Sequence, residues 1–219
     1  MVSLDEIAIK YGTDKSSKIH NYCDKYEKYF NFTRESDIKI LEIGVFNGES
    51  LSTWNEFYPN SLVVGIDIDS RCKDYERDNI KVEIGSQDDE LFLNLVNEKY
   101  GDFNLIIDDG SHLQSHMIKS FEILFPLLNK GGVYVVEDVC CSYWGGYEGG
   151  LKKNGTSVEY FKNLIDDVNF YGEMSENFTP NVARREDVLI DHVITKNLSI
   201  RCDIESINFL NSLIIITKR

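Results

Sequence analysis

Two short acidic segments carry the side chains best suited to chemistry. Residues 108–112 read DDGSH and residues 137–138 read ED, and each segment directly follows an apolar run. Carboxylates gathered in one place repel one another unless a cation or shared protons relieve the charge. Oxygen ligands select hard cations, so Mg²⁺ is the natural candidate, with Mn²⁺ and Ca²⁺ as alternatives.

Other interpretations of these segments remain open. Asp109 and Gly110 suit a turn, and Glu137 and Asp138 suit the cap of a loop. Successive residues of a strand also point to opposite faces, so not every carboxylate can reach one ion.

His112 closes the first acidic segment, at the start of an expected helix. An imidazole titrates near neutrality and can accept a proton from a reacting hydroxyl. His112 is therefore the candidate general base, and His116, one helical turn later, is the weaker candidate.

The elements that must position these residues follow from the apolar pattern. Four apolar runs without polar alternation predict strands buried on both faces, as in a parallel sheet, and a weaker strand is expected at 80–84. The four runs are residues 38–41, 62–66, 103–107 and 133–136. Helix-length segments separate the strands, at about 49–58, 70–78, 88–99 and 112–126. This alternation predicts a doubly wound α/β sheet, which brings both acidic segments to the edge where ligands bind.

The two ends of the chain differ from this alternating middle. Residues 1–30 are expected to form a helical N-terminal segment, and a helix is expected at 157–171. The apolar runs 204–209 and 213–217 are so closely linked that they must pair antiparallel. A mostly parallel sheet closed by an antiparallel hairpin is the arrangement of Rossmann-like class I methyltransferases, and we expect one domain over 1–219.

A nucleoside site is predicted where the first strand ends. Gly44 and Gly48 allow close approach of a ligand to the backbone, and Asp67, at the end of the next strand, is placed to reach ribose hydroxyls. Glu42 would oppose a pyrophosphate but would attract the ammonium of a methionine moiety. The pattern therefore favours S-adenosylmethionine (SAM) over NAD, although a nicotinamide-dependent oxidoreductase and a turn without ligand remain alternatives. Gln87 and Asp88 follow the weaker strand, where they suit either an adenine contact or a helix cap.

Composition narrows the class of partner. The chain has 37 acidic and 23 basic side chains, for a net charge of −14. This balance disfavours a nucleic acid or an anionic membrane as partner. We find no secretory signal, no membrane-spanning run and no C-x-x-C pair among five cysteines, so a reduced cytoplasmic protein is expected.

At these residues the sequence resembles the metal-dependent sugar O-methyltransferases of macrolide biosynthesis, of the mycinamicin and tylosin type, and related bacterial saccharide methyltransferases. The likeness spans about residues 11–217, and its matching pieces include YGTDK at 11–15, LEIG at 41–44, DGSH at 109–112, VED at 136–138 and the glycine-rich aromatic stretch 142–150. The sequence is short beside the macrolide enzymes, and we expect it to lack a large N-terminal extension like theirs.

The resemblance implies SAM-dependent methyl transfer to a hydroxyl of a sugar or glycosylated small molecule. It implies Mg²⁺ held by Asp109, Glu137 and Asp138, with His112 as general base and Asp109 as a second catalytic residue. The expected cofactor-binding residues are Tyr11, Thr13, Lys15, Glu42, Gly44, Gly48, Ser50, Asp67, Ile68, Gln87, Asp88 and Asp108.

The expected saccharide contacts are Tyr143 and Trp144, in an acceptor-side loop at 140–156, because aromatic faces suit sugar rings. An anchored surface loop is the alternative there. Members of this group tend to form homo-oligomers. A catechol-type acceptor and a catalytically silent SAM-binding scaffold also remain open.

Overall fold

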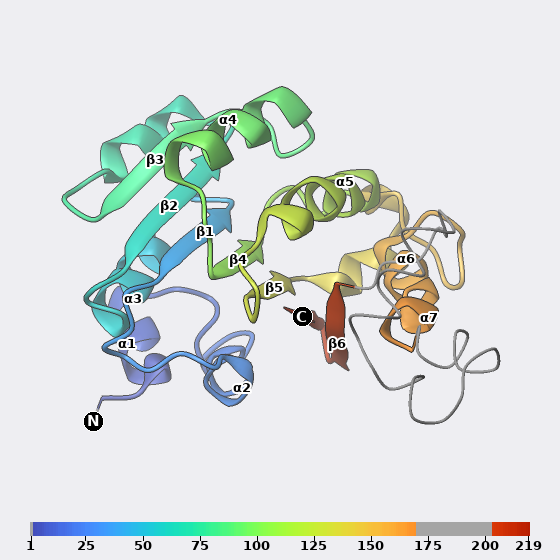
Figure 1. Cartoon of the computed structure of the whole chain (residues 1–219), viewed down its shortest axis with the longest axis horizontal. Helices are drawn as coiled ribbons and strands as arrows, with labels where there is room; N and C mark the ends of the chain where they lie inside the picture. Colours follow the sequence, from blue (N-terminus) through green and yellow to red (C-terminus); the bar gives the residue numbers. More distant parts are fainter. Residues whose placement is uncertain (1, 170–202) are drawn as a thin grey trace, which may run out of the picture.

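The computed structural model describes residues 2–169 and 203–219. Within these residues, seven strands form one sheet in the order β3-β2-β1-β4-β5-β7-β6 (Figure 1). The strands are β1 (Lys39–Ile43), β2 (Leu62–Asp67), β3 (Ile80–Ile84), β4 (Leu105–Asp108), β5 (Val133–Val136), β6 (Ile204–Leu210) and β7 (Leu213–Lys218). Strands β1 to β5 are parallel, whereas β7 pairs antiparallel with both β5 and β6. The predicted parallel sheet with an antiparallel C-terminal hairpin is confirmed.

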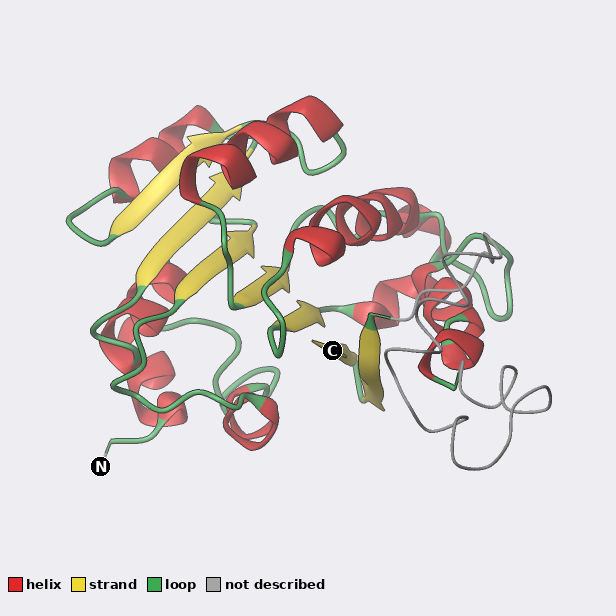
Figure 2. Ribbon diagram, in the orientation of Figure 1, coloured by secondary structure: helices red, strands yellow, loops and turns green. Residues whose placement is uncertain are grey.

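Helices cover both faces of the sheet (Figure 2). The α-helices are α1 (Leu4–Tyr11), α2 (Cys23–Tyr29), α3 (Glu49–Phe57), α4 (Glu90–Tyr100), α5 (Gln114–Leu124), α6 (Ser157–Asn163) and α7 (Ile165–Val168). Short 3₁₀ helices are η1 (Ser70–Tyr75), η2 (Phe125–Leu127), η3 (Val139–Tyr143) and η4 (Gly145–Tyr147). No helix in the two described ranges is both long and apolar enough to cross a membrane.

Side chains alternate between the two faces of the sheet, so the interior is divided into two hydrophobic cores. One face of the sheet packs with α1, α2 and α3, and contributes Ile40, Val63 and Ile107; the opposite face packs with α4, α5 and α6, and contributes Leu41 and Ile106. Neighbouring residues of one strand thus enter different cores, as the period of a strand requires. This double burial explains why the central strands contain few polar residues.

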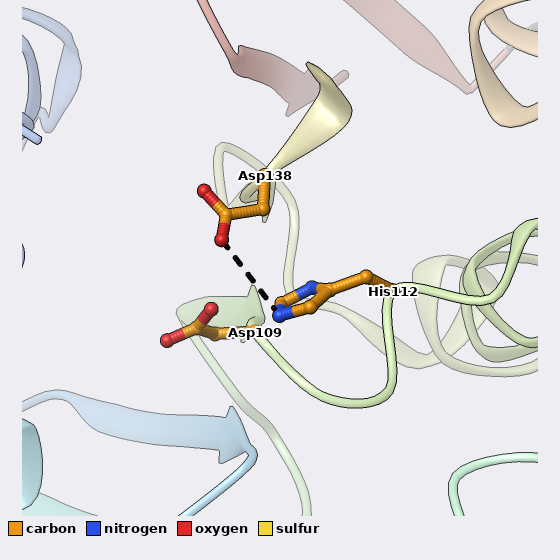
Figure 3. A group of neighbouring side chains, drawn as sticks. All are labelled: Asp109, His112 and Asp138. Atoms are coloured by element: carbon orange, nitrogen blue, oxygen red, sulfur yellow. Dashed lines mark ion pairs between the residues drawn. The ribbon is translucent and has the colours of Figure 1, made fainter. Parts of the chain in front are cut away.

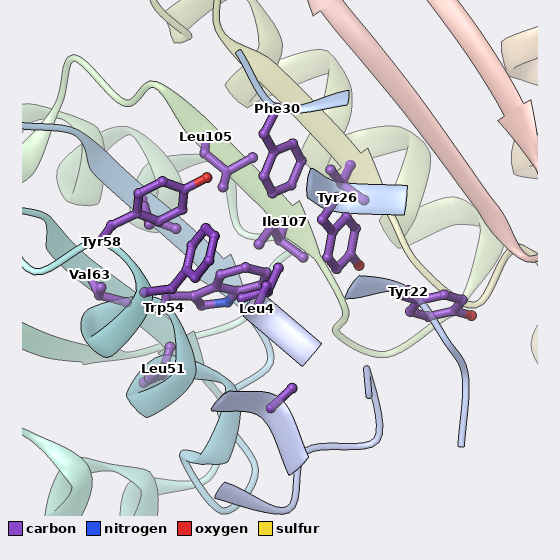
Figure 4. Close-up of a cluster of buried hydrophobic side chains, with 14 of the residues drawn as sticks. Leu4, Tyr22, Tyr26, Phe30, Leu51, Trp54, Tyr58, Val63, Leu105 and Ile107 are labelled. Carbon is purple, nitrogen blue, oxygen red and sulfur yellow. The ribbon is translucent and has the colours of Figure 1, made fainter. Parts of the chain in front are cut away.

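An aromatic cluster fixes the N-terminal segment on the first of these cores. Tyr26 of α2 stacks on Phe30 at a centroid distance of 5.0 Å and lies 5.6 Å from Trp54 of α3 (Figure 4). Aromatic pairs at these separations add to the free energy gained from burial. The chain between α1 and α2 is therefore held close to the carboxyl ends of β4 and β5.

Three expected helices differ from those in the structure. The helix expected at 112–126 begins only at Gln114, because His112 has a φ of +57°, which an α-helix cannot contain. The segment expected as a helix at 70–78 forms the 3₁₀ helix η1, which ends at Tyr75. The helix expected at 157–171 is broken at Leu164 into α6 and α7, and its last two residues lie outside the described ranges.

Candidate functional site

The site lies where β1, β4 and β5 end. Gly44 follows β1 with a φ of +93°, and a Cβ there would collide with the backbone carbonyl of Asp109. The turn after β1 and the loop after β4 therefore touch through their backbones, which only glycine permits at this position. This contact brings the glycine turn and the first acidic segment to one place.

Three side chains converge at this edge. Single ligand atoms of Asp109, His112 and Asp138 lie within 4.8 Å of one another (Figure 3). His112 Nε2 lies 3.7 Å from Asp138 Oδ2. All three side chains are partly exposed, and His112 Nδ1 is buried without a hydrogen-bond partner among the described residues. Two carboxylates and an imidazole are donors that suit a divalent cation.

The backbone presents two of these side chains in an unusual conformation. His112 and Asp138 have φ values of +57° and +47°, in the left-handed region that non-glycine residues seldom occupy. Each residue directs its side chain towards the other, as Figure 3 shows. The turn after β4 and the turn after β5 thus place both groups over the same point.

A lysine from the N-terminal segment lies among the remaining acids. Lys15 Nζ is 2.8 Å from Glu137 Oε2 and 3.5 Å from Glu42 Oε1, and it also forms an ion pair with Asp109. Lys15 is only 2% exposed, and Glu42 and Glu137 are as deeply buried. Burial acts to lower the pKa of Lys15, but the three carboxylates outweigh it and raise that pKa well above its ordinary value. Lys15 is therefore a charged ammonium inside the protein.

Each oxygen of Glu137 has a partner of its own. Lys15 donates to Oε2, and the buried hydroxyl of Tyr26 donates to Oε1. Glu42 Oε2 accepts bonds from Ser50 Oγ, at 2.8 Å, and from Trp54 Nε1. Burial raises the pKa of Glu42 to about 7, and Lys15 opposes that rise. Glu42 thus faces an ammonium that belongs to the protein itself.

Two adjoining cavities form one cleft along this edge. A cavity of about 380 Å³ is lined by the N-terminal segment and by the converging side chains, and includes Thr13, Lys15, Gly44, Ser50, Asp109, His112 and Asp138. A second cavity, of about 270 Å³, is lined by residues that include Gly44, Asp67, Ile68, Gln87 and Asp109. Gly44 and Asp109 line both cavities, so the cleft is continuous past the end of β4.

Asp67 holds the glycine turn through hydrogen bonds to the backbone of that turn. Its Oδ2 accepts hydrogen bonds from the backbone N–H groups of Val45, at 2.9 Å, and Phe46, at 3.1 Å. Burial acts to raise the pKa of Asp67, but backbone donors outweigh it and the pKa is lowered. Phe46 is 79% exposed and Ile68 is 74% exposed, and both border the second cavity. Phe46 was not predicted, although an aromatic residue inside a glycine turn is the signal that points to it.

Several predicted cofactor residues do not line the cleft. Tyr11 donates its hydroxyl to Glu56, on the outer side of α3. Gly48 is the N-cap of α3, where a Cβ would strike the ring of Tyr75. Asp88 faces His116, with 3.5 Å between Oδ2 and Nε2.

Asp108 lies beneath the cleft. It is 1% exposed and accepts bonds from Gln87 and Ser120, and burial raises its pKa to about 6. The role of each of these residues in cofactor binding stays a prediction.

The loop after β5 carries the predicted saccharide residues. Tyr143 and Trp144 are 50% and 53% exposed. The ring of Tyr147 lies 6.0 Å from that of Trp144 and 6.2 Å from that of His112. Tyr147, which was not predicted, thus joins the exposed aromatic residues to the candidate base.

Gln114 ties this loop to the loop that carries His112. Its Nε2 donates to the carbonyl of His112 at 3.0 Å, and its Oε1 accepts from the hydroxyls of Ser142 and Ser157. Gln114 and both serines are buried. Sequence reasoning missed Gln114 because an amide at a helix start gives no signal of partners so distant in the chain.

Comparisons with known proteins find relatives over about three quarters of the chain. No family model matches the sequence. L-olivosyl-oleandolide 3-O-methyltransferase of Streptomyces antibioticus is 40% identical over 76% of this chain and 46% of its own length. Mycinamicin VI 2''-O-methyltransferase of Micromonospora griseorubida is 35% identical over 75% of this chain and 44% of its own length. The chain therefore spans about half the length of the curated relatives that it matches.

A solved structure shares the fold over nearly the whole chain. MycE methyltransferase from the mycinamycin biosynthetic pathway, in complex with Mg and SAH, superposes with a TM-score of 0.83 and 28% sequence identity. The superposition covers 99% of this chain and 54% of MycE. Over about three quarters of its length the chain is therefore similar to macrolide and tetracenomycin sugar O-methyltransferases, and it shares the class I methyltransferase fold of MycE.

Proposed function

We propose that this chain transfers the methyl group of SAM to a hydroxyl of a sugar on a glycosylated small molecule, assisted by Mg²⁺. The observation that carries the proposal is the convergence of Asp109, His112 and Asp138 at the end of a cleft that also contains Asp67. A methyl donor in the second cavity would point its reactive end towards the three converging side chains, because Asp109 lines both cavities. Solved MycE structures in complex with Mg and SAH, and one that also contains mycinamycin VI, support this assignment.

The cofactor would occupy the second cavity and the glycine turn. Phe46 and Ile68 offer exposed apolar surface to an adenine ring, and a nucleoside there would cover it. Asp67 would accept bonds from the ribose hydroxyls while it holds the turn through Val45 and Phe46. Thr13 and Ser50 line the first cavity, where the methionine end would lie.

The donor set at the end of the cleft fits a hard divalent cation. Asp109 and Asp138 would supply carboxylate oxygens, and both are partly exposed to the cleft. Glu137, the third predicted ligand, would first have to release Lys15 or Tyr26. A bound Mg²⁺ would lower the pKa of the acceptor hydroxyl and stabilise the developing negative charge.

His112 would act as the general base. Its Nε2 faces Asp138 and would accept the proton of the acceptor hydroxyl. The hydroxyl oxygen forms a bond to the methyl carbon, the carbon–sulfur bond breaks, and its electron pair remains on sulfur. The products are the methyl ether and S-adenosylhomocysteine.

The loop 140–156 would lie against the acceptor. Tyr143 and Trp144 present half-exposed aromatic faces, and Tyr147 continues them to His112. Aromatic faces of this kind suit the apolar face of a sugar ring. We also propose that residues 1–219 form a single domain and that the chain forms homo-oligomers.

The deciding experiment is a SAM-dependent assay against a panel of glycosylated macrolides, nucleotide sugars and catechols, with products detected by mass. We expect methylated product from a glycosylated acceptor and none from catechol. His112→Ala should reduce kcat by about 10²–10⁴-fold while the affinity for SAM stays near that of the wild type. Undiminished turnover by this variant would show that another group accepts the proton.

A thermal-shift titration separates the remaining alternatives. SAM and S-adenosylhomocysteine should raise the Tm, whereas NAD should not, since a ligand stabilises the native state that binds it. A shift with NAD alone would favour an oxidoreductase. A shift with SAM but no product from any acceptor would favour a silent SAM-binding scaffold.

A further inference from the structure

We propose that Lys15 is a cation built into the acidic site: a positioning residue that counters the negative charge of Glu42 and Glu137 and weakens the attraction of Asp109 for a divalent cation. The part that concerns the divalent cation rests on the proposed function. The part that concerns the two buried glutamates does not. Neither part needs Lys15 to touch the cofactor.

The contacts of Lys15 show an ammonium enclosed by carboxylates. Glu137 and Glu42 lie 2.8 and 3.5 Å from Nζ, and Asp109 forms the third ion pair. The side chain of Lys15 is 3% exposed, and those of Glu42 and Glu137 are 0% and 2% exposed. These charges are thus largely shielded from water, and each depends on the others.

The backbone of Lys15 is anchored independently of its side chain. The carbonyl of Lys15 accepts hydrogen bonds from the N–H groups of Tyr22, at 2.8 Å, and Cys23, at 3.3 Å, where α2 begins. Helix α2 is itself fixed by the stacking of Tyr26 on Phe30 and Trp54. The ammonium is thus delivered to the acids by a rigid part of the fold, and its position needs no ligand.

The charges gathered at this edge of the sheet show what Lys15 contributes. Four carboxylates meet at this edge, namely those of Glu42, Asp109, Glu137 and Asp138. Lys15 contributes one positive charge, a divalent cation would contribute two, and SAM carries a single net positive charge. Without Lys15, the same carboxylates would face one positive charge less, whether or not a ligand is bound.

Asp109 is the carboxylate that the two cations would share. It pairs with Lys15, and it also belongs to the group formed with His112 and Asp138. A fixed positive charge beside a metal site weakens the binding of the metal, because like charges repel. Removing Lys15 should therefore destabilise the metal-free protein and strengthen its binding of Mg²⁺, two effects of opposite sign.

The test compares variants by thermal unfolding, first in EDTA and then with increasing Mg²⁺. Lys15→Met keeps the length of the side chain and removes its charge. In EDTA its Tm should fall by about 10 °C, as breaking a buried ion pair does in a protein of this size. Lys10→Met is the matched control, because Lys10 pairs with Glu56 while its side chain is 59% exposed. Its Tm should change by no more than about 3 °C.

A double variant separates loss of charge from loss of packing. Lys15→Met with Glu137→Gln removes both charges of the closest pair and leaves an amide oxygen for Tyr26. It should recover at least half of the Tm lost by Lys15→Met, or fold if that variant does not. A double variant no more stable than the single one, or an unchanged Tm of Lys15→Met in EDTA, would overturn the counter-ion role.

The titration with Mg²⁺ tests whether Lys15 weakens the binding of the divalent cation. The concentration of Mg²⁺ that gives half of the maximal Tm shift should be about tenfold lower for Lys15→Met than for the wild type. An equal or higher concentration would show that Lys15 does not oppose the cation. If Mg²⁺ shifts the Tm of no variant, including the wild type, the metal part of the proposed function fails, while the measurements in EDTA still decide the role of Lys15.

Discussion

The two sides of the cleft are built in opposite ways. On the sheet side, Glu42, Glu137 and Lys15 are buried and their charges offset one another. On the loop side, Tyr143 and Trp144 leave about half of their surface exposed. The buried acids of the sheet side thus have a cation of the protein among them, whereas the loop side presents aromatic surface that is half exposed within the described residues. The comparison separates the part proposed to fix the chemistry from the part proposed to select the acceptor.

Gln114 is the contact through which the two sides meet. It binds the carbonyl of His112 and the hydroxyls of Ser142 and Ser157, so the candidate base and the aromatic loop share one buried amide. Changes on the sheet side should therefore reduce the rate of the chemistry, changes on the loop side should weaken acceptor binding, and changes at Gln114 should do both.

The largest effect is expected on the sheet side, at Asp109. Asp109→Asn removes the charge that borders both cavities and should reduce kcat by about 10³-fold, since it takes away a group proposed to hold the metal. Steady-state kinetics at saturating Mg²⁺ measure this loss. EDTA should likewise stop the wild type, and added Mg²⁺ should restore only the wild type.

The control for this change is Asp74→Asn, because Asp74 is exposed on η1, away from the cleft. Its kinetics should match those of the wild type. If Asp109→Asn keeps most of the wild-type turnover, the sheet side does not fix the chemistry as described.

The next largest effect is expected at Gln114, in both the stability of the protein and its kinetics. Gln114→Leu leaves the His112 carbonyl and two buried hydroxyls without this partner, and should lower the free energy of unfolding by about 3 kcal/mol. The same change should lower kcat and raise the acceptor KM, while the affinity for SAM changes little. Chemical denaturation and steady-state kinetics measure the two effects.

Asn60→Leu is the matched control for Gln114→Leu. It removes one exposed amide hydrogen bond, to the carbonyl of Glu35, and should change neither kinetics nor stability appreciably. Loss of stability in Gln114→Leu without any change in the kinetic parameters would mean that the role of Gln114 is only structural.

A smaller effect is expected on the loop side. Trp144→Ala should raise the acceptor KM by about tenfold, equivalent to one lost aromatic contact, and leave the Tm unchanged because the ring is half exposed. Leu151→Ala, at a residue that is 76% exposed, should leave both the KM and the Tm unchanged. A fall in kcat alone would place Trp144 with the chemistry instead.

The smallest effect concerns the stability of the glycine turn at low pH. The lowered pKa of Asp67 means that its carboxylate stabilises the fold above the ordinary value of 3.8 and loses that contribution as the pH falls through the folded-state pKa. The Tm difference between the wild type and Asp67→Asn should therefore be constant at neutral pH and shrink below pH 3.8. A difference that does not depend on pH would show that the charge of Asp67 plays no part.

The sheet, its ligand-binding edge and the glycine turn could be predicted because each follows from residues that are close together in the sequence. Apolar runs such as 133–136 identify buried strands, and the rule that ligands bind at strand ends then brings Asp109 and Asp138 together. The ion pair between Lys15 and Asp109 joins residues 94 positions apart. No periodicity encodes such a contact, so Lys15 was predicted as a cofactor residue and its burial among acids was not foreseen.

The helix starting at Gln114 and the roles of Tyr147 and Gln114 were missed for a related reason. Residues 112–126 carry a helical pattern, but the left-handed backbone at His112 delays the helix by two positions. That conformation depends on the loop's tertiary setting, which a pattern of residue types does not contain.

The left-handed backbone of His112 and Asp138 has a consequence for engineering. Each conformation costs on the order of 1 kcal/mol for a residue with a side chain, and glycine would adopt it without that strain. Selection of variants for heat resistance alone should therefore accumulate replacements at these two positions, and the more stable variants would lack two side chains proposed to act in methyl transfer. A screen for a more stable form of this chain must therefore measure the proposed methyl transfer together with the Tm.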